Sequence, residues 1–300
     1  MTPRELEKLY SEGKNITALL RNELNIKHNT PEIIEVAYDM QTGSYIEGMK
    51  DPSLASQQEE YSLTIAKVIA SLGESKSILE VGVGEATTLS GVLQNIEYDV
   101  KSYGFDLSWS RIAFAKNWLH SQGLINTTLC TGDLFNIPFR DNSIDIVYSS
   151  HSIEPNGGNE AQILKELHRI ARKHVVLLEP AYELSNEEAK KRMDYHGYCK
   201  GLKKTAISLN YDVVQHELLP VAYNPLNPTA LTIISKQSNA ELPKDVLACP
   251  KFKTPLKEVN GVMYSPEGLV AYPIIGGIPC LRIENGVFSS KLEEIMGDNF

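Results

Sequence analysis

Short apolar runs alternate with amphipathic segments through the middle of the chain. This alternation predicts strands separated by helices, and hence a mostly parallel sheet that is covered on both faces. The expected strands begin at Ile78 and continue as Val100–Phe105, Thr127–Cys130, Ile144–Ser149 and His174–Leu178, with helices at Ser108–Leu119 and Glu160–Ala171 between them. A helical stretch over 185–209 and two last strands, Tyr211–Leu219 and Thr229–Lys236, complete the predicted α/β domain. A ligand is then expected beyond the carboxyl ends of the strands.

The first expected strand runs directly into a glycine turn, Gly82-Val83-Gly84, which a helical pattern follows. Glycines let a ligand approach the backbone closely, and the N-terminus of a helix presents unpaired N–H groups and a positive dipole. Acidic residues stand near the ends of three expected strands, as Glu80, Asp106 and Asp133. Together these features predict a binding site for a nucleotide cofactor.

Over residues 61–236 the chain resembles the class I S-adenosylmethionine-dependent methyltransferases. The glycine motif of that family reads acid-x-Gly-x-Gly-x-Gly, and here Ala86 stands at the third glycine. The resemblance implies a Rossmann-like sheet of seven strands, S-adenosyl-L-methionine as cofactor and S-adenosyl-L-homocysteine as product. A nicotinamide enzyme also uses an acid after its second strand, so Asp106 does not discriminate. Asp133 and the closing pair of strands favour the methyltransferase.

The same resemblance implies roles for individual residues. Gly82 and Gly84 would bring the backbone against the methionine moiety, and Glu80 would order that loop and the amino group of the cofactor. Asp106 would accept hydrogen bonds from the ribose, and Asp133 would contact the adenine amino group while Leu134 packs on the ring. The complete set of expected cofactor-binding residues is Tyr38, Tyr45, Glu80, Gly82, Gly84, Asp106, Leu107, Asp133, Leu134 and Ser149.

The first sixty residues predict a separate helical cap. Thr2–Tyr10 and Ile16–Leu24 have helical patterns, and a third helix is expected to begin at Thr30-Pro31, with proline in its first turn. Tyr38 and Tyr45 bracket a polar turn beyond it. Two interpretations stay open for these tyrosines: they contact the carboxylate of the cofactor or the substrate, or they anchor the cap to the sheet as half-buried packing residues.

The expected chemistry lies after the fourth strand, in the segment SSHSIEPNGGNE. Methyl transfer is an in-line displacement that depends on alignment, and a general base helps only when the acceptor carries a proton. His151 and Glu154 are the candidate catalytic residues of this segment, because imidazole is the natural base near neutral pH. The alternative for His151 is a structural role in shaping the loop. Asn156 is a candidate substrate-binding residue.

A second polar and aromatic cluster occurs in the segment MDYHGYCKGL. It follows the fifth strand, where members of the resembled family often place acceptor-binding residues. His196 is a further catalytic candidate here, and Asp194, Tyr195 and Tyr198 are candidate substrate-binding residues. The alternative is an ordinary surface helix.

A polar linker, residues 237–244, separates the α/β domain from a small β-rich domain expected over 245–300. This tail contains the motifs Leu247-Ala-Cys-Pro and Ala271-Tyr-Pro-Ile-Ile-Gly-Gly-Ile-Pro. In these motifs the tail resembles the zinc-ribbon-like domain that activates tRNA and translation-factor methyltransferases. The usual Cys-Pro-x-Cys is replaced by Cys249-Pro250-Lys251-Phe252, and the segment keeps only Cys249 and Cys280 and lacks histidine. A tetrahedral zinc site needs four ligands, so no metal is expected. Phe252 is predicted to fill the vacated site, which would make the tail a packing or dimerisation module.

Composition narrows the function. The chain has 300 residues and a formal net charge of −9, which argues against a broad phosphate-binding surface. Four cysteines without disulfide-like spacing suit a cytoplasmic setting, and neither a signal-peptide core nor a membrane-length apolar run is expected. We therefore expect methyl transfer to a small molecule rather than to nucleic acid, and a homodimer stays open. The alternative is an RNA- or protein-modifying methyltransferase whose tail docks the macromolecule.

Overall fold

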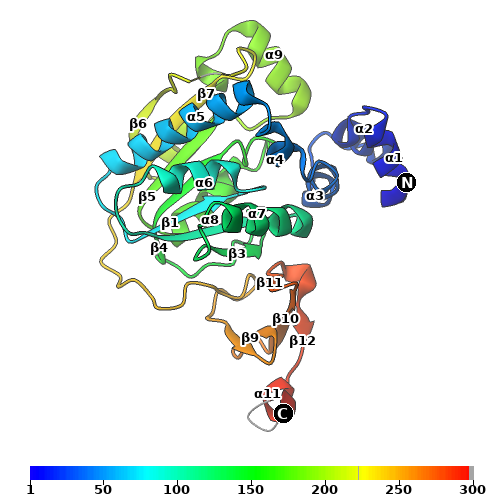
Figure 1. The fold of residues 1–300 in the computed structure, drawn as a ribbon, viewed down its shortest axis with the longest axis vertical. Coiled ribbons are helices and arrows are strands. Elements are labelled where there is room, and N and C mark those ends of the chain that lie inside the picture. The colour runs from blue at the N-terminus through cyan, green and yellow to red at the C-terminus, as the bar shows by residue number, and fades with distance from the viewer. Residues whose placement is uncertain (222, 297–300) are drawn as a thin grey trace.

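A seven-stranded sheet forms the centre of the protein (Figure 1). The computed structural model describes residues 1–221 and 223–296. The strand order is β3-β2-β1-β4-β5-β7-β6, in which the pairs β5–β7 and β7–β6 are antiparallel and the other neighbouring pairs are parallel. This confirms the predicted sheet and its closing hairpin. The strands are β1 Ser77–Val81, β2 Lys101–Asp106, β3 Thr128–Thr131, β4 Ile144–Ser150, β5 Ala171–Pro180, β6 Asp212–Leu218 and β7 Thr229–Ser235.

Helices cover both faces of the sheet because the central strands are apolar on both sides. One face, which includes Ile78 and Ile146, packs against α5, α6 and α7. The other, which includes Leu79 and Val147, packs against α8 and α10. The helices are α5 Pro52–Ser71, α6 Thr87–Gln94, α7 Trp109–Ser121, α8 Glu160–Ile170, α9 Glu187–His196 and α10 Leu202–Ser208, with a short η1 at Tyr182–Leu184. No helix in the described ranges has both the length and the apolar character needed to cross a membrane.

Two expected boundaries differ from the observed ones. The helical stretch predicted over 185–209 is two helices, because Gly197 ends α9 and Gly201 precedes α10, both with positive φ angles (72° and 69°). The boundary between cap and sheet domain, expected after residue 60, falls inside α5, which continues without a break from Pro52 to Ser71. The elements before Pro52 are the ones that form the cap.

The cap consists of α1 Pro3–Ser11, α2 Ile16–Leu24, α3 Pro31–Asp39 and α4 Ser44–Gly48. Thr2 begins α1 with a capping box that it shares with Glu5, and the Thr30 side chain accepts the N–H of Ile33 at the start of α3. Leu6, Ile16 and Ala37 form a small core of their own. The cap lies to one side of the sheet, and α3 and α4 lie nearest to it (Figure 1).

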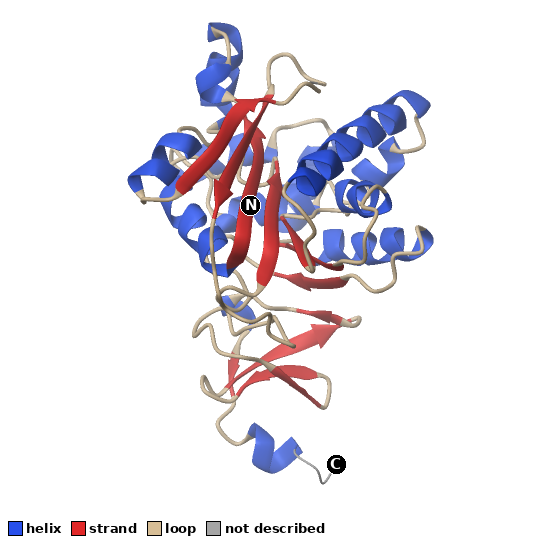
Figure 2. Ribbon diagram, turned by 90° about the vertical axis from the view of Figure 1, so that its left-hand side faces the viewer, coloured by secondary structure: helices blue, strands red, loops and turns tan. Residues whose placement is uncertain are grey.

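The tail packs below the sheet and covers its β3 edge (Figure 2). The Leu281 N–H donates to the Thr131 carbonyl at 3.2 Å, and Thr131 pairs in parallel with Cys280. Pairing of this kind protects an edge that would otherwise expose unpaired backbone groups. The tail contains β8 Lys257–Val259, β9 Val262–Ser265, β10 Val270–Ile275, β11 Ile278–Pro279, β12 Val287–Phe288, η2 Ile283–Asn285 and α11 Leu292–Met296.

Phe252 lies elsewhere than predicted. Phe252 is 46% exposed, and its ring lies over Gly268 rather than inside the domain. The buried Tyr272 contacts Cys249 instead, with 3.2 Å between its hydroxyl and the Cys249 sulfur. Across residues 1–221 and 223–296, no group of three or more His, Cys, Asp or Glu side chains is arranged to hold a metal ion.

Candidate active site

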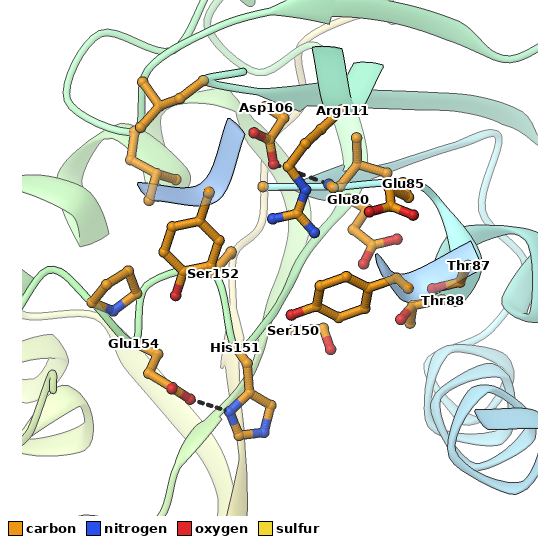
Figure 3. Close-up of a pocket in the computed structure, with 18 of the residues that line it drawn as sticks. Glu80, Glu85, Thr87, Thr88, Asp106, Arg111, Ser150, His151, Ser152 and Glu154 are labelled. Atoms are coloured by element: carbon orange, nitrogen blue, oxygen red, sulfur yellow. Dashed lines mark hydrogen bonds and ion pairs between the residues drawn. The ribbon is translucent and has the colours of Figure 1, made fainter. Parts of the chain in front are cut away.

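A cavity of about 390 Å³ opens at the carboxyl ends of β1, β2 and β4 and is covered by α3 and α4 (Figure 3). This is the place that the order of a parallel sheet predicts for a ligand. Its wall combines the glycine turn, the loops after β2 and β4, and the loop between β6 and β7. The wall includes Tyr38, Tyr45, Glu80, Gly82, Gly84, Asp106, Leu107, Asp133, Leu134, His151, Glu154 and Asn156 from the sequence-based set.

The glycine turn has space for backbone only. Gly82 and Gly84 have φ angles of +64° and +55°, in the left-handed region where a side chain is strained. A Cβ atom on Gly82 would lie 2.3 Å from the Ser152 Cβ, and one on Gly84 would lie 2.6 Å from a guanidinium nitrogen of Arg111. Ala86 takes the third glycine position at φ +59° and precedes α6, whose first turn has no side-chain cap. Thr87 and Thr88 of this first turn line the cavity, at a helix start that suits an anion, while the backbone N–H of Leu89 donates to Glu80.

Two carboxyl groups flank the turn. Asp106 receives the N–H of Gly84 on one oxygen and the N–H of Ser108 on the other, both at 3.0 Å, so it fixes the glycine turn and the start of α7. Glu80 is 2% exposed and accepts the Tyr148 hydroxyl at 2.8 Å. Burial and the charge of Asp106 raise the pKa of Glu80 to about 8, against the opposing hydrogen bond from Tyr148.

The cap is attached to the glycine turn through Glu85, which sequence reasoning missed. Its carboxylate accepts the N–H groups of Gly43 and Ile46, each at 2.9 Å, although these residues lie about forty positions earlier in the chain. The Ser108 hydroxyl adds a second attachment by donating to Asp39 at 2.6 Å. The position of Glu85 directly after Gly84 was the only feature of the sequence that could have pointed to this role. It does not reveal that the partners of Glu85 are backbone N–H groups of the cap.

Arg111 is the second missed residue of this region. It lies in the first turn of α7, is 6% exposed, and extends into the cavity (Figure 3). The rings of Tyr38 and Tyr45 pack on its guanidinium, at 5.5 Å and 4.8 Å from ring centroid to Cζ. Both interpretations of the tyrosines thus have a structural basis, because they line the cavity and also join the cap to the sheet domain.

His151 and Glu154 form a close pair at the other end of the cavity. The His151 Nδ1 lies 2.5 Å from a Glu154 oxygen, and its Nε2 lies 2.8 Å from the Thr229 hydroxyl. Burial alone would lower the pKa of His151, but the hydrogen bond and charge of Glu154 raise it. Burial alone would raise the pKa of Glu154, but His151, Tyr198 and Asn227 lower it. The pair therefore favours a carboxylate beside an imidazole that binds a proton readily.

Glu179, at the end of β5, holds the loop that carries this pair. Its carboxyl group accepts three consecutive backbone N–H groups, those of Ser152, Ile153 and Glu154, at 3.0 to 3.2 Å. Burial raises the pKa of Glu179 to about 7. His151 itself has φ +51°, a conformation that costs energy for a residue other than glycine and that its surroundings must maintain. Sequence reasoning missed this role of Glu179.

The remaining candidates lie outside the cavity wall. Asp194 is engaged on the surface by Tyr182 and Lys200, and Tyr195 is 70% exposed. His196 stacks on Tyr198 with 5.2 Å between ring centroids. Of the second cluster, only Tyr198 contributes to the pair described above, through its effect on the pKa of Glu154. The structure thus separates Asp194, Tyr195 and His196 from the cavity that they were expected to serve, because they lie on α9.

Ser149 also lies away from the cavity wall. It is fully buried in β4, where successive side chains point to opposite faces, and the next residue, Ser150, faces the cavity instead. The Ser150 hydroxyl lies 2.9 Å from that of Tyr61. The observed strand β4 ends at Ser150, one residue later than predicted, so Ser150 rather than Ser149 faces the cavity.

Comparison with known proteins supports the assignment of this fold. Residues 78–174 match the family described as "Methyltransferase domain". Over 99 residues the chain is 28% identical to the demethylmenaquinone methyltransferase of Geobacillus stearothermophilus, a match that covers 33% of this chain and 42% of the relative. The chain thus matches less than half the length of this curated relative.

Solved structures extend the likeness to the whole sheet domain. The magnesium protoporphyrin IX methyltransferase of Synechocystis PCC 6803, solved with bound SAH, aligns with a TM-score of 0.53 at 10% identity over 69% of this chain and 100% of that chain. The [4+2]-cyclase SpnF aligns with a TM-score of 0.55 at 13% identity, over 71% of this chain and 99% of that chain. At these identities the likeness concerns the fold alone, since one fold hosts several reactions. Residues 78–174 therefore match a methyltransferase domain, and the chain shares its fold with the Synechocystis enzyme.

Proposed function

We propose that the protein is an S-adenosylmethionine-dependent methyltransferase that acts on a small molecule. The observation that supports this most directly is one continuous cavity, with the cofactor-type glycine turn at one end and the His151–Glu154 pair at the other. The match of residues 78–174 to a methyltransferase domain agrees with it. This arrangement suits a reaction in which a donor and an acceptor must be aligned in a site that excludes water.

The residues at the donor end fit the cofactor. The backbone at Gly82 and Gly84 leaves a cradle that a Cβ atom would fill, and the first turn of α6 presents Thr87 and Thr88 to the cavity, where a helix start suits a carboxylate. Asp106 would hold the ribose, and Asp133 and Leu134 would hold the adenine. When bound, S-adenosylmethionine supplies a methyl group on an electrophilic sulfonium centre.

At the acceptor end, His151 would remove the proton of the acceptor group. Because Nδ1 faces the Glu154 carboxylate, it carries the hydrogen, and Nε2 keeps the lone pair that can accept a proton. The Thr229 hydroxyl, 2.8 Å from Nε2, donates to this lone pair in the same tautomer and marks the position that an acceptor hydroxyl would take. Glu154 then stabilises the imidazolium, and Glu179 holds the loop in place.

The dimensions and lining of the cavity favour a small acceptor. At about 390 Å³ it lies at the lower end of the usual range for ligand sites, roughly 300–1,000 Å³, and the cofactor would occupy much of it. Within the described part of the chain, Arg111 is the one Lys or Arg residue of its wall, and amides and phenols line the acceptor end. The tail binds the β3 edge of its own sheet, so that strand is not free to dock a macromolecule. The four cysteines are free and buried, in agreement with the proposed cytoplasmic setting.

The test uses S-adenosylmethionine labelled in its methyl group. The purified protein is incubated with this cofactor and a cell extract, and the labelled product is separated by size and identified. A labelled small molecule that is absent with the Asp106→Ala variant supports the proposal. Label in RNA or protein would instead support the alternative, a macromolecule-modifying methyltransferase.

A further inference from the structure

A buried guanidinium without a polar partner lies in the donor end of the cavity. Arg111 is 6% exposed, and within residues 1–221 and 223–296 its side chain forms no hydrogen bond and no ion pair within 4.0 Å. Its Nε atom is completely buried without a partner. A charged group in this condition is expensive, because the loss of hydration is not repaid by hydrogen bonds to its N–H donors. The site is therefore incomplete as it stands, and an anion would complete it.

The carboxylates nearest to Arg111 are already engaged elsewhere. Both oxygens of Asp106 accept backbone N–H groups, from Gly84 and Ser108. Both oxygens of Glu85 accept backbone N–H groups too, from the α4 region of the cap. Their charges still raise the pKa of Arg111 against the opposing effect of burial, so the guanidinium remains charged. Asp106 and Glu85 thus stabilise the positive charge of Arg111 from a distance, but they accept no hydrogen bond from its N–H groups.

Two aromatic rings hold the guanidinium in its position. Tyr38 and Tyr45 approach it through their ring faces, at 5.5 Å and 4.8 Å, as cation–π contacts do. Face contacts restrict the plane of the group but leave the N–H edge unpaired. A planar fork of donors in this condition is suited to a carboxylate, which it can bind through two parallel hydrogen bonds.

The location identifies which carboxylate. The guanidinium lies over the glycine turn, since a Cβ atom on Gly84 would be 2.6 Å from one of its nitrogens. Figure 3 shows it between Asp106 and Glu85, away from the His151–Glu154 pair. We propose that Arg111 binds the methionine carboxylate of the cofactor. This inference rests on the proposed function, and it gives Tyr38 and Tyr45 the task of fixing the arginine when the cap covers the cofactor.

The test compares two ligands that differ in the amino-acid moiety. S-adenosylhomocysteine carries the carboxylate, and 5′-methylthioadenosine keeps the nucleoside and the sulfur but has no carboxylate. Calorimetric titration of the full-length protein is done with both ligands, for the wild type and for Arg111→Gln and Arg111→Lys. Arg4→Gln is the matched control, because Arg4 lies on the surface with a side chain that is 88% exposed.

Arg111→Gln is expected to weaken S-adenosylhomocysteine binding by about 10- to 100-fold, as for the loss of a charged hydrogen-bond partner. Binding of 5′-methylthioadenosine is expected to change less than about twofold, and Arg111→Lys to be intermediate because it keeps the charge but loses the fork. The melting temperature of the ligand-free variant should not fall, since an unpaired buried charge has been removed.

Equal weakening of both ligands would overturn the inference, because Arg111 would then only shape the pocket. Unchanged S-adenosylhomocysteine binding would also overturn it and would leave an acidic acceptor as the anion. Absence of any binding by the wild type would instead contradict the proposed function, and the inference with it.

Discussion

The contact between Gly82 and Ser152 gives the sharpest prediction about the architecture of the site. It joins the turn after β1 to the loop after β4, so it determines how closely the donor and acceptor ends of the cavity approach. The perturbation is Gly82→Ala. The new Cβ atom would lie 2.3 Å from the Ser152 Cβ and 3.1 Å from its hydroxyl oxygen, whereas carbon atoms in contact normally lie about 3.5–4.0 Å apart.

Two costs add up in Gly82→Ala. The φ angle of +64° lies in the left-handed region, which costs an L residue about 1–2 kcal/mol. Relief of the overlap by backbone or side-chain shifts costs about 1–3 kcal/mol more. We therefore expect the free energy of unfolding to fall by about 2–5 kcal/mol. The reduced flexibility of the unfolded chain offsets at most about 1 kcal/mol of this loss.

Two matched variants separate these costs. Gly123→Ala carries the conformational cost alone, because Gly123 has φ +78° and a Cβ atom there would meet nothing within 4 Å. Ser152→Gly removes the Cβ and the hydroxyl that the new methyl group meets, and leaves only the Cα at 3.5 Å, an ordinary contact. The double variant Gly82→Ala/Ser152→Gly should therefore recover about 1–3 kcal/mol relative to the sum of the single variants.

The assay is equilibrium urea unfolding of the four variants and the wild type, followed by circular dichroism. The contact between Gly82 and Ser152 is excluded if Gly82→Ala costs no more than Gly123→Ala, or if the effects of the two mutations at positions 82 and 152 are simply additive. In either case the two loops would not be in contact as described, and the cavity would be wider than 390 Å³ suggests.

Three further predictions concern charge. Burial raises the pKa of Glu80 to about 8 in the folded state. The stability that this group contributes is therefore present below its unfolded pKa of 4.5 and is lost as the pH rises through 8, a loss of at most about 5 kcal/mol. Glu80→Gln should reduce this loss when the urea midpoints at pH 5 and pH 8 are compared with those of the wild type. Glu154 raises the pKa of His151, so Glu154→Gln should lower the plateau of the profile of kcat/KM against pH and move the rising limb of that profile to lower pH. A rising limb that does not move would exclude His151 as the base. Arg282 of the tail forms an ion pair with Glu35 of α3. Arg282→Gln should therefore lower the free energy of unfolding by about 1–3 kcal/mol and weaken cofactor binding. An unchanged free energy of unfolding would show that the tail does not support the cap.

The sequence was sufficient for the parts of the fold that local patterns encode. The apolar strands, the helix starts at Ser108 and Thr30 and the closing pair of strands each follow from a few neighbouring residues, and each is found in the structure. The glycine turn and Asp106 were identified because their spacing along the chain is the signal. Such features need no knowledge of distant contacts.

The missed features all depend on residues far apart in the chain. Glu85 holds backbone N–H groups about forty positions earlier, and Glu179 holds a loop about 25 positions earlier, so no local pattern could reveal either role. The cluster on α9 failed for the opposite reason. Its composition suggested chemistry, but the side of a helix that faces a distant cavity cannot be derived from composition, and Asp194 and Tyr195 are not among the residues that line the cavity. In the tail, Phe252 lies half exposed, and the buried ring beside Cys249 is that of Tyr272, about 20 positions later in the chain.

The central claim is that the cavity binds S-adenosylmethionine at the glycine turn. Calorimetric titration of the full-length protein with S-adenosylhomocysteine, alongside Asp106→Ala, tests it most directly. We predict one site per chain for the wild type and an affinity that falls at least about tenfold in the variant, which loses hydrogen bonds to a charged group. Absence of binding by the wild type, or equal affinity in the variant, would contradict the account.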